Sequence, residues 1–116
     1  MLVQELNGDE LTLWVALAAG YAKSKLHYGG FVSQEGDFVG HVGGNFEPQY
    51  APHENWSQGG PLFSDAGIGA ERDYDGLWVA RCGEGDGFIG ETELIAKARA
   101  FVDMRFCSVV LDEVPV

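Results

Sequence analysis

Basic side chains are scarce in this sequence. Lys and Arg together number 7 against 18 Asp and Glu residues, which gives a formal net charge of −11 over 116 residues. Because phosphate groups are bound mainly through Lys and Arg, this composition disfavours direct binding of nucleic acid and of anionic membrane surfaces. The excess of carboxylates is compatible with three interpretations: solubility alone, docking of a basic partner, or mimicry of nucleic acid toward a nucleic-acid-binding protein.

Long apolar runs and a basic leader are also missing. No run approaches the roughly 18 apolar residues that cross a bilayer, and the N-terminus carries no basic segment of the signal-peptide kind. We therefore expect one cytoplasmic domain, residues 1–116, with no membrane partner.

Cysteine and histidine are too few and too widely spaced to suggest a metal site. Cys82 and Cys107 are expected to be free thiols in a cytoplasmic protein. His27, His41 and His53 show none of the short spacings that zinc sites use. The sequence thus predicts no metal and no cofactor.

Two amphipathic helices are expected near the ends of the chain. The first covers residues 8–19, with Asn7 as its N-cap and with Leu11, Trp14, Val15 and Ala18 on one apolar face. The second covers residues 91–106, where apolar residues again recur at helical spacing. Strand-length apolar segments and turn residues lie between and after them, with strands expected over 26–28, 31–33, 38–42, 68–73, 76–81 and 108–111. The strands over 68–73 and 76–81 are expected to form a hairpin, because Asp75-Gly76 is a strong turn signal. This order predicts an α+β fold in which two helices pack on one mainly antiparallel sheet of short strands.

The segment from Tyr50 to Pro61 has no hydrophobic periodicity. It combines aromatic rings, prolines, side-chain amides and a Gly-Gly pair, which is typical of a structured surface loop. Pro61 is expected at the first position of a short helical turn over residues 61–64. The candidate binding residues come from this segment and from two neighbouring elements: Tyr50, Pro52, Asn55, Trp56, Gln58, Gly59, Gly60, Pro61, Trp78 and Thr92.

No catalytic pattern accompanies this segment. Gly85–Gly90 matches G-x-G-x-x-G, but the surrounding carboxylates of Glu84, Asp86, Glu91 and Glu93 would repel a pyrophosphate. We therefore expect a non-enzymatic binding protein. The mixture of rings and amides fits a protein partner, or a nucleotide or metabolite stacked on Trp56 or Tyr50. An exposed indole is also compatible with contact between identical chains.

Three motifs in this chain resemble those of a known family. They are Leu-x-Gly-x-x-Leu-x-x-x-Val-Ala, then Tyr-x-Pro-x-x-x-Trp-x-x-Gly-Gly-Pro, then Thr-x-Leu-Ile-Ala-x-Ala-Arg. Their residues here are Leu6, Gly8, Leu11, Val15 and Ala16; Tyr50, Pro52, Trp56, Gly59, Gly60 and Pro61; and Thr92, Leu94, Ile95, Ala96, Ala98 and Arg99. Together they are similar to the phage NinX-like proteins, small phage and prophage proteins of unknown function. The resemblance covers nearly the whole chain and carries over no catalytic residues. It implies a phage or prophage accessory protein in the cytoplasm of a bacterial host. Together with the segment from Tyr50 to Pro61, this leads to the hypothesis that the protein modulates or sequesters a host factor.

Overall fold

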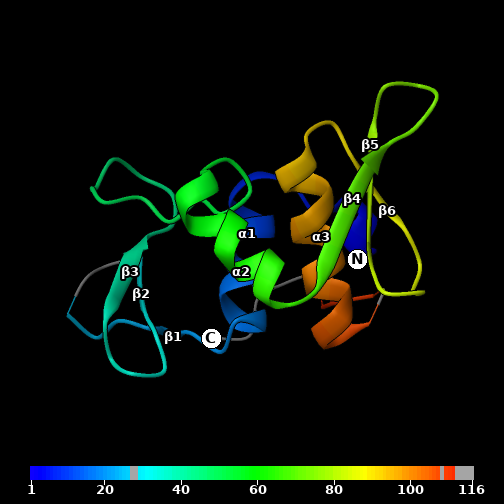
Figure 1. Ribbon diagram of the computed structural model, residues 1–116. Helices are drawn as coiled ribbons and strands as arrows, with labels where there is room; N and C mark the ends of the chain where they lie inside the picture. The colour runs from blue at the N-terminus through cyan, green and yellow to red at the C-terminus, as the bar shows by residue number, and fades with distance from the viewer. Residues whose placement is uncertain (27–28, 108, 112–116) are drawn as a thin grey trace.

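Helices occupy the middle of the molecule, and a small sheet lies on either side of them (Figure 1). The computed structural model describes residues 1–26, 29–107 and 109–111. The elements follow in the order η1 (Val3–Glu5), α1 (Gly8–Ala18), β1 (Ala22–Lys23), β2 (Gly30–Val32), β3 (Phe38–His41), α2 (Trp56–Asp65), β4 (Ile68–Arg72), β5 (Trp78–Cys82), β6 (Phe88–Gly90) and α3 (Glu93–Phe106). The α+β class expected from the sequence is therefore confirmed.

The arrangement of the elements differs from the expected one. Instead of two helices on one sheet, the described residues form three α-helices and two antiparallel sheets, in the strand orders β1-β2-β3 and β4-β5-β6. Strand-like patterns show where strands lie but not which strands pair, and here α2 separates the two groups in the chain. Among the described residues, no helix has the length and apolar content needed to cross a bilayer.

Helix α1 packs in two hydrophobic clusters. Leu11 and Trp14, on its expected apolar face, join the larger cluster with residues of α3 and of the β4–β6 sheet. Ala16 packs instead with Phe31 and Tyr50 in a second, smaller cluster beside the other sheet. Burial therefore extends around most of α1, which explains why Thr12, a polar residue between these faces, is also buried.

Some strand predictions hold and others are corrected. The hairpin of β4 and β5, with its turn at Asp73–Gly76, is confirmed. The strand expected at residues 26–28 is wrong for Leu26, which is exposed because the chain already pairs at Ala22 and Lys23; His27 and Tyr28 lie outside the described residues. Strand β6 was not expected, because its glycine-rich surroundings resemble a turn.

The expected C-terminal strand is reduced to a single contact. Val109 forms an isolated antiparallel bridge with Leu2, and Ser108 lies outside the described residues. The Met1 carbonyl accepts a hydrogen bond of 2.9 Å from the Val110 N–H, which ties the start of the chain to the segment after α3.

Helix α2 begins five residues before the turn that was expected to start at Pro61. Asn55 is its N-cap, and the Asn55 side chain accepts a hydrogen bond of 2.9 Å from the Ser57 N–H. Pro61 consequently lies inside the helix. Glycine and proline are poor helix formers, so tertiary packing must stabilise this stretch: Gly59 and Phe63 are buried, and Gly59 lies directly against the Pro52 carbonyl.

The two glycines of α2 are expected to respond in opposite ways to substitution by alanine. A Cβ at Gly59 would overlap the Pro52 carbonyl oxygen, so Gly59→Ala should lower the free energy of unfolding by about 1–3 kcal/mol. A Cβ at Gly60 would meet its nearest neighbour, Trp56 Cε3, at 3.4 Å. Gly60→Ala should therefore be neutral or stabilising by up to about 1 kcal/mol through helix propensity. Urea denaturation of both variants checks this, and equal effects would contradict the close packing of Gly59.

Candidate functional site

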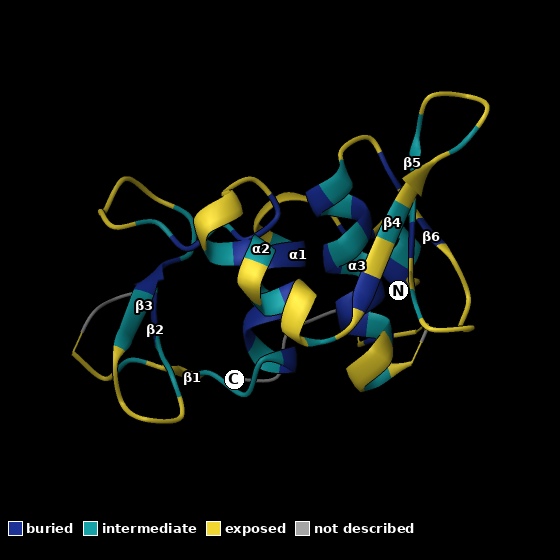
Figure 2. Cartoon of the chain, in the orientation of Figure 1, coloured by how far each residue is buried: buried dark blue, intermediate teal, exposed yellow. Residues whose placement is uncertain are grey.

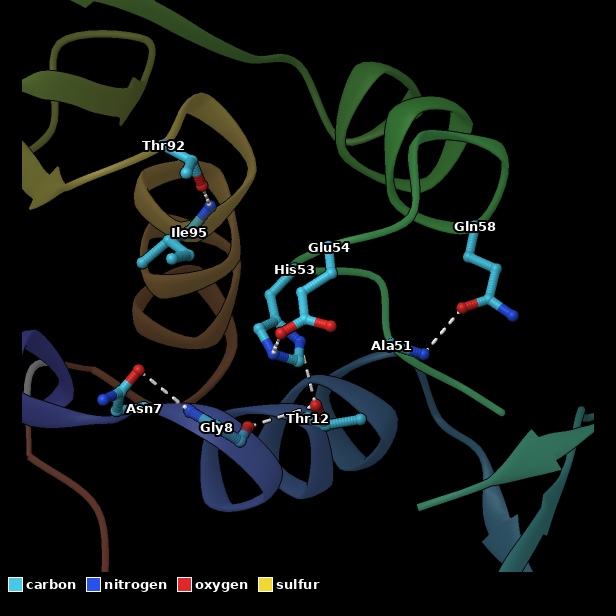
Figure 3. A network of polar contacts seen from close by, with 9 residues as sticks. All are labelled: Asn7, Gly8, Thr12, Ala51, His53, Glu54, Gln58, Thr92 and Ile95. Carbon is cyan, nitrogen blue, oxygen red and sulfur yellow. Dashed lines mark hydrogen bonds and ion pairs between the residues drawn. The ribbon is translucent and has the colours of Figure 1, made fainter. Parts of the chain in front are cut away.

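The segment between Tyr50 and α2 is held by hydrogen bonds to its own backbone. The Gln58 carboxamide accepts from the Ala51 N–H at 2.6 Å (Figure 3). It also donates to the Gln49 carbonyl at 2.7 Å. The Asn55 side chain accepts hydrogen bonds from both the N–H and the hydroxyl of Ser57. Both candidate amides are thus engaged within the chain, and they fix the start of α2.

The candidate residues Tyr50 and Pro52 are buried. Tyr50 is 3% exposed and packs edge-on against Tyr21, with ring centroids 5.8 Å apart. Burial raises the pKa of the Tyr50 phenol above its ordinary value, and the neighbouring Tyr21 raises it further. Pro52 is also fully buried. These residues anchor the segment to the protein interior and leave other side chains to form its surface.

His53 connects this segment to helix α1. Its Nδ1 lies 3.0 Å from Thr12 Oγ1, and its Nε2 lies 3.5 Å from Glu54 Oε1 (Figure 3). Burial lowers the pKa of His53, and this effect exceeds the opposing influence of the Glu54 and Asp9 carboxylates. In the neutral ring with its proton on Nε2, that proton faces Glu54. The single proton of the Thr12 hydroxyl is then shared between two acceptors, His53 Nδ1 at 3.0 Å and the Gly8 carbonyl at 3.2 Å.

Trp56 is the exposed aromatic of the segment, with 53% of its surface accessible. It occupies the first turn of α2, and Lys97 of α3 places its ammonium 5.5 Å from the centre of the indole ring. Lys97 also pairs with Glu93 one turn earlier, at 3.8 Å, as the i,i+4 spacing favours. A cation over an indole contributes about 0.5–1 kcal/mol at an exposed site. These contacts hold the indole beside the first turns of α3.

An open groove of about 330 Å³ lies between the two helix starts, and we call it the Trp56 groove. Apolar side chains of α3, a hydroxyl and two carboxylates surround the indole. Its lining residues are His53, Glu54, Trp56, Thr92, Glu93, Leu94 and Ile95. Thr92 is the N-cap of α3, and its hydroxyl accepts from the Ile95 N–H at 3.1 Å. A groove of this composition fits an apolar group that carries a hydrogen-bond donor or a positive charge.

The structure brings only part of the predicted set to this groove. Of the ten candidates, Trp56 and Thr92 line it. Trp78 does not line it; this residue lies in β5, where the Arg72 guanidinium is 5.7 Å from its ring. The other candidates shape or fasten the segment behind it, as described above for Tyr50, Pro52, Asn55, Gln58 and Gly59; Gly60 and Pro61 are internal residues of α2.

Sequence reasoning missed several residues in the groove and beside it. Lys97 had a visible signal, since it follows Glu93 at the spacing of an ion pair, but nothing in the sequence linked it to Trp56. His53 carried no local signal because its partner Thr12 lies 41 residues earlier. Within the described ranges, no cluster of three or more His, Cys, Asp or Glu residues is arranged to hold a metal ion.

The free energy of unfolding should depend on the protonation of His53. Its pKa in the folded protein lies below the unfolded value of about 6.5, so acid favours the unfolded state. The free energy of unfolding should fall as the pH drops from about 6.5 through the lower folded pKa. His53→Gln lacks this titration, and its curve should decline less over that window. Urea denaturation at a series of pH values measures both, with the remaining histidines common to the two proteins. Parallel curves would contradict a neutral, buried His53.

Comparison with known proteins identifies the family. The family described as bacteriophage P22 NinX matches residues 2–105. This range extends from before α1 almost to the end of α3, and it includes every residue of the Trp56 groove. No curated protein sequence matches the chain. The resemblance seen in the sequence motifs is confirmed, and the chain belongs to the bacteriophage P22 NinX family as a phage accessory protein.

Proposed function

We propose that this phage accessory protein is a non-enzymatic binding module that engages a host protein through the Trp56 groove. The observation that supports this most is the exposure of Trp56 in a segment whose tyrosine ring is buried and whose side-chain amides are hydrogen-bonded to the backbone of the segment. Tryptophan dominates many protein interfaces because a rigid indole buries much apolar area at little entropic cost. Binding in the cytoplasm of the bacterial host would modulate or sequester the partner.

Charge favours a protein with basic side chains as the partner. Glu54 and Glu93 flank the indole, and the chain carries a net charge of −11. Lys97 already pairs with Glu93, so the Glu54 carboxylate and the net charge of the chain are what would attract Lys or Arg and repel the phosphates of a nucleotide. The overall charge would also speed encounter with a basic partner at low ionic strength.

The chemistry of the groove supports binding rather than catalysis. Its histidine is neutral and buried, with Nδ1 engaged by Thr12. The Thr92 hydroxyl is occupied by capping α3. Neither group is arranged as a nucleophile next to a free base, which is the geometry that covalent or acid–base catalysis requires.

A capture experiment with matched aromatic variants tests this function. Immobilised wild type, Trp56→Ala and Tyr74→Ala are each exposed to bacterial host lysate, and the bound proteins are identified by mass spectrometry. Tyr74 is the control because it is another exposed aromatic residue but lies in the β4–β5 turn, away from the groove. A partner should be retained by wild type and Tyr74→Ala, and Trp56→Ala should bind it with at least ~2 kcal/mol less affinity.

Two results would contradict the proposal. Equal capture by wild type and Trp56→Ala would show that the Trp56 groove does not bind the partner. A melting temperature that rises with the concentration of a nucleotide or metabolite, and does so less in Trp56→Ala, would favour a small-molecule site instead. Circular dichroism of each variant controls for loss of folding.

A further inference from the structure

Another hollow, of about 540 Å³, lies where α1 meets the sheet of β1–β3, and we call it the lysine hollow. Its volume is within the range of roughly 300–1,000 Å³ that small-molecule sites occupy. Its apolar lining includes Leu13 of α1 with Phe31 and Val42 of the sheet region, and its charged lining is Lys23 and Lys25. It shares no lining residue with the Trp56 groove, so it is a separate place on the molecule.

Strand pairing places Lys23 over the apolar lining. Lys23 lies opposite Phe31 in the antiparallel pair of β1 and β2, and residues opposite one another project from the same face of a sheet. Phe31 is buried against Ala16, so this face is the one toward α1. Both residues of β1 are nevertheless exposed (Figure 2). The stem of Lys23 therefore lies beside apolar groups, while its ammonium is open to solvent.

Hydrogen bonds hold the chain that carries Lys25. The Ser24 N–H donates to the Gly30 carbonyl at 2.8 Å, and the Ser24 hydroxyl oxygen accepts from the Leu26 N–H at 3.2 Å. These bonds lie on both sides of Lys25 and tie its backbone to the start of β2. The two lysines are thus presented at the hollow by a hydrogen-bonded backbone.

The two ammonium groups have no counter-charge in the part of the chain that the structure describes. Neither Lys23 nor Lys25 forms an ion pair or a side-chain hydrogen bond with a described residue. Lys97, by contrast, pairs with Glu93. Of the described residues that line the hollow, none is Asp or Glu, although the chain has 18 of them. An acidic protein therefore keeps two unpaired cations at one hollow.

The net charge of −11 opposes an anion only at long range. At physiological ionic strength, exposed charges that are more than about 8 Å apart are largely screened. One carboxylate, that of Asp9, stands beside the hollow, since its Oδ2 would lie 2.9 Å from a Cβ at Gly43, the residue after Val42. Against it stand the two ammonium groups of the lining itself. A nucleic acid would extend to the remaining carboxylates of the chain, whereas a small anion meets mainly this local positive charge.

We propose that the lysine hollow binds a small phosphate monoester whose apolar body is about as large as an aromatic ring. A phosphate monoester carries about 1.5–2 negative charges near neutral pH, so one group can pair with both ammonium groups. Lysine binds phosphate as a point charge and does not need the planar geometry of an arginine fork. The apolar body would cover Leu13 and Val42, which are only partly buried.

Calorimetric titration with three probes tests the chemistry of the ligand. Phenyl phosphate combines a dianion with a ring, benzoate carries a single charge on the same ring, and inorganic phosphate lacks the ring. Phenyl phosphate should bind at least about tenfold more tightly than inorganic phosphate, because burial of the ring adds apolar area. It should also bind more tightly than benzoate, which can neutralise only one ammonium group. No binding of phenyl phosphate, or equal binding of either other probe, would overturn the proposal.

Charge variants test whether the two lysines form the site. Lys23→Gln and Lys25→Gln should each weaken the binding of phenyl phosphate by about three- to fivefold in Kd, as expected for the loss of an exposed ion pair. Arg105→Gln is the matched control, because it removes the same charge from an exposed residue of α3 outside the hollow. Its Kd should equal that of wild type. An equal loss in Arg105→Gln would indicate attraction by overall charge and would overturn the site. Circular dichroism checks that each variant is folded.

Nitrogen–proton correlation spectra locate the bound probe. Phenyl phosphate should shift the backbone amides of Ser24, Gly30 and Val42, and these shifts should be lost when Lys23 and Lys25 are both replaced by Gln. Shifts confined to other parts of the chain would overturn the proposal. Trp56→Ala should bind phenyl phosphate as wild type does, so failure here is distinguishable from failure of the host-binding proposal.

Discussion

Burial of α1 on several sides is the constraint on which the rest of the structure depends. One side of the helix contributes Leu11 and Trp14 to the cluster shared with α3, and Ala16 packs with Phe31 and Tyr50. Thr12 lies between these contacts and meets His53. Because Tyr50 and His53 are both tied to α1 or its cluster, the intervening chain has little freedom. The packing of these residues against α1 therefore sets the direction in which the chain enters α2.

This arrangement explains how an unusual sequence presents one aromatic ring. The prolines, glycines and amides of residues 50–61 shape and fasten the backbone, and Trp56 remains at the surface beside Lys97. The Lys97 contact and the N-cap of α2 restrict the positions open to this ring. Binding as proposed would then avoid part of the ordering cost that a flexible loop would carry.

The elements with strong local signals could be predicted from the sequence. Helices α1 and α3 follow from apolar periodicity, with Asn7 as the N-cap of α1, and the β4–β5 hairpin follows from its Asp-Gly turn. Helix α2 was missed because Gly59, Gly60 and Pro61 have poor helix propensity, which packing against Pro52 overrides. The division into two sheets was also missed, because strand pairing depends on tertiary contacts that the local sequence does not show. Trp56 and Thr92 were found as chemically distinctive residues, whereas the contact of Lys97 with Trp56 depends on how α2 meets α3.

Gln4 gives the β4–β6 sheet a limit on its growth. Small antiparallel sheets with two bare sides can add strands repeatedly, which is the route from a folded protein to a fibre. On the β6 side, the Ile89 N–H donates to Gln4 Oε1, and the Ile89 carbonyl accepts from both Gln4 Nε2 and Arg99 Nη1. These contacts of Gln4 and Arg99 leave no free backbone group of Ile89 for a further strand, so this edge of the sheet is closed to the repeated strand addition that builds fibres.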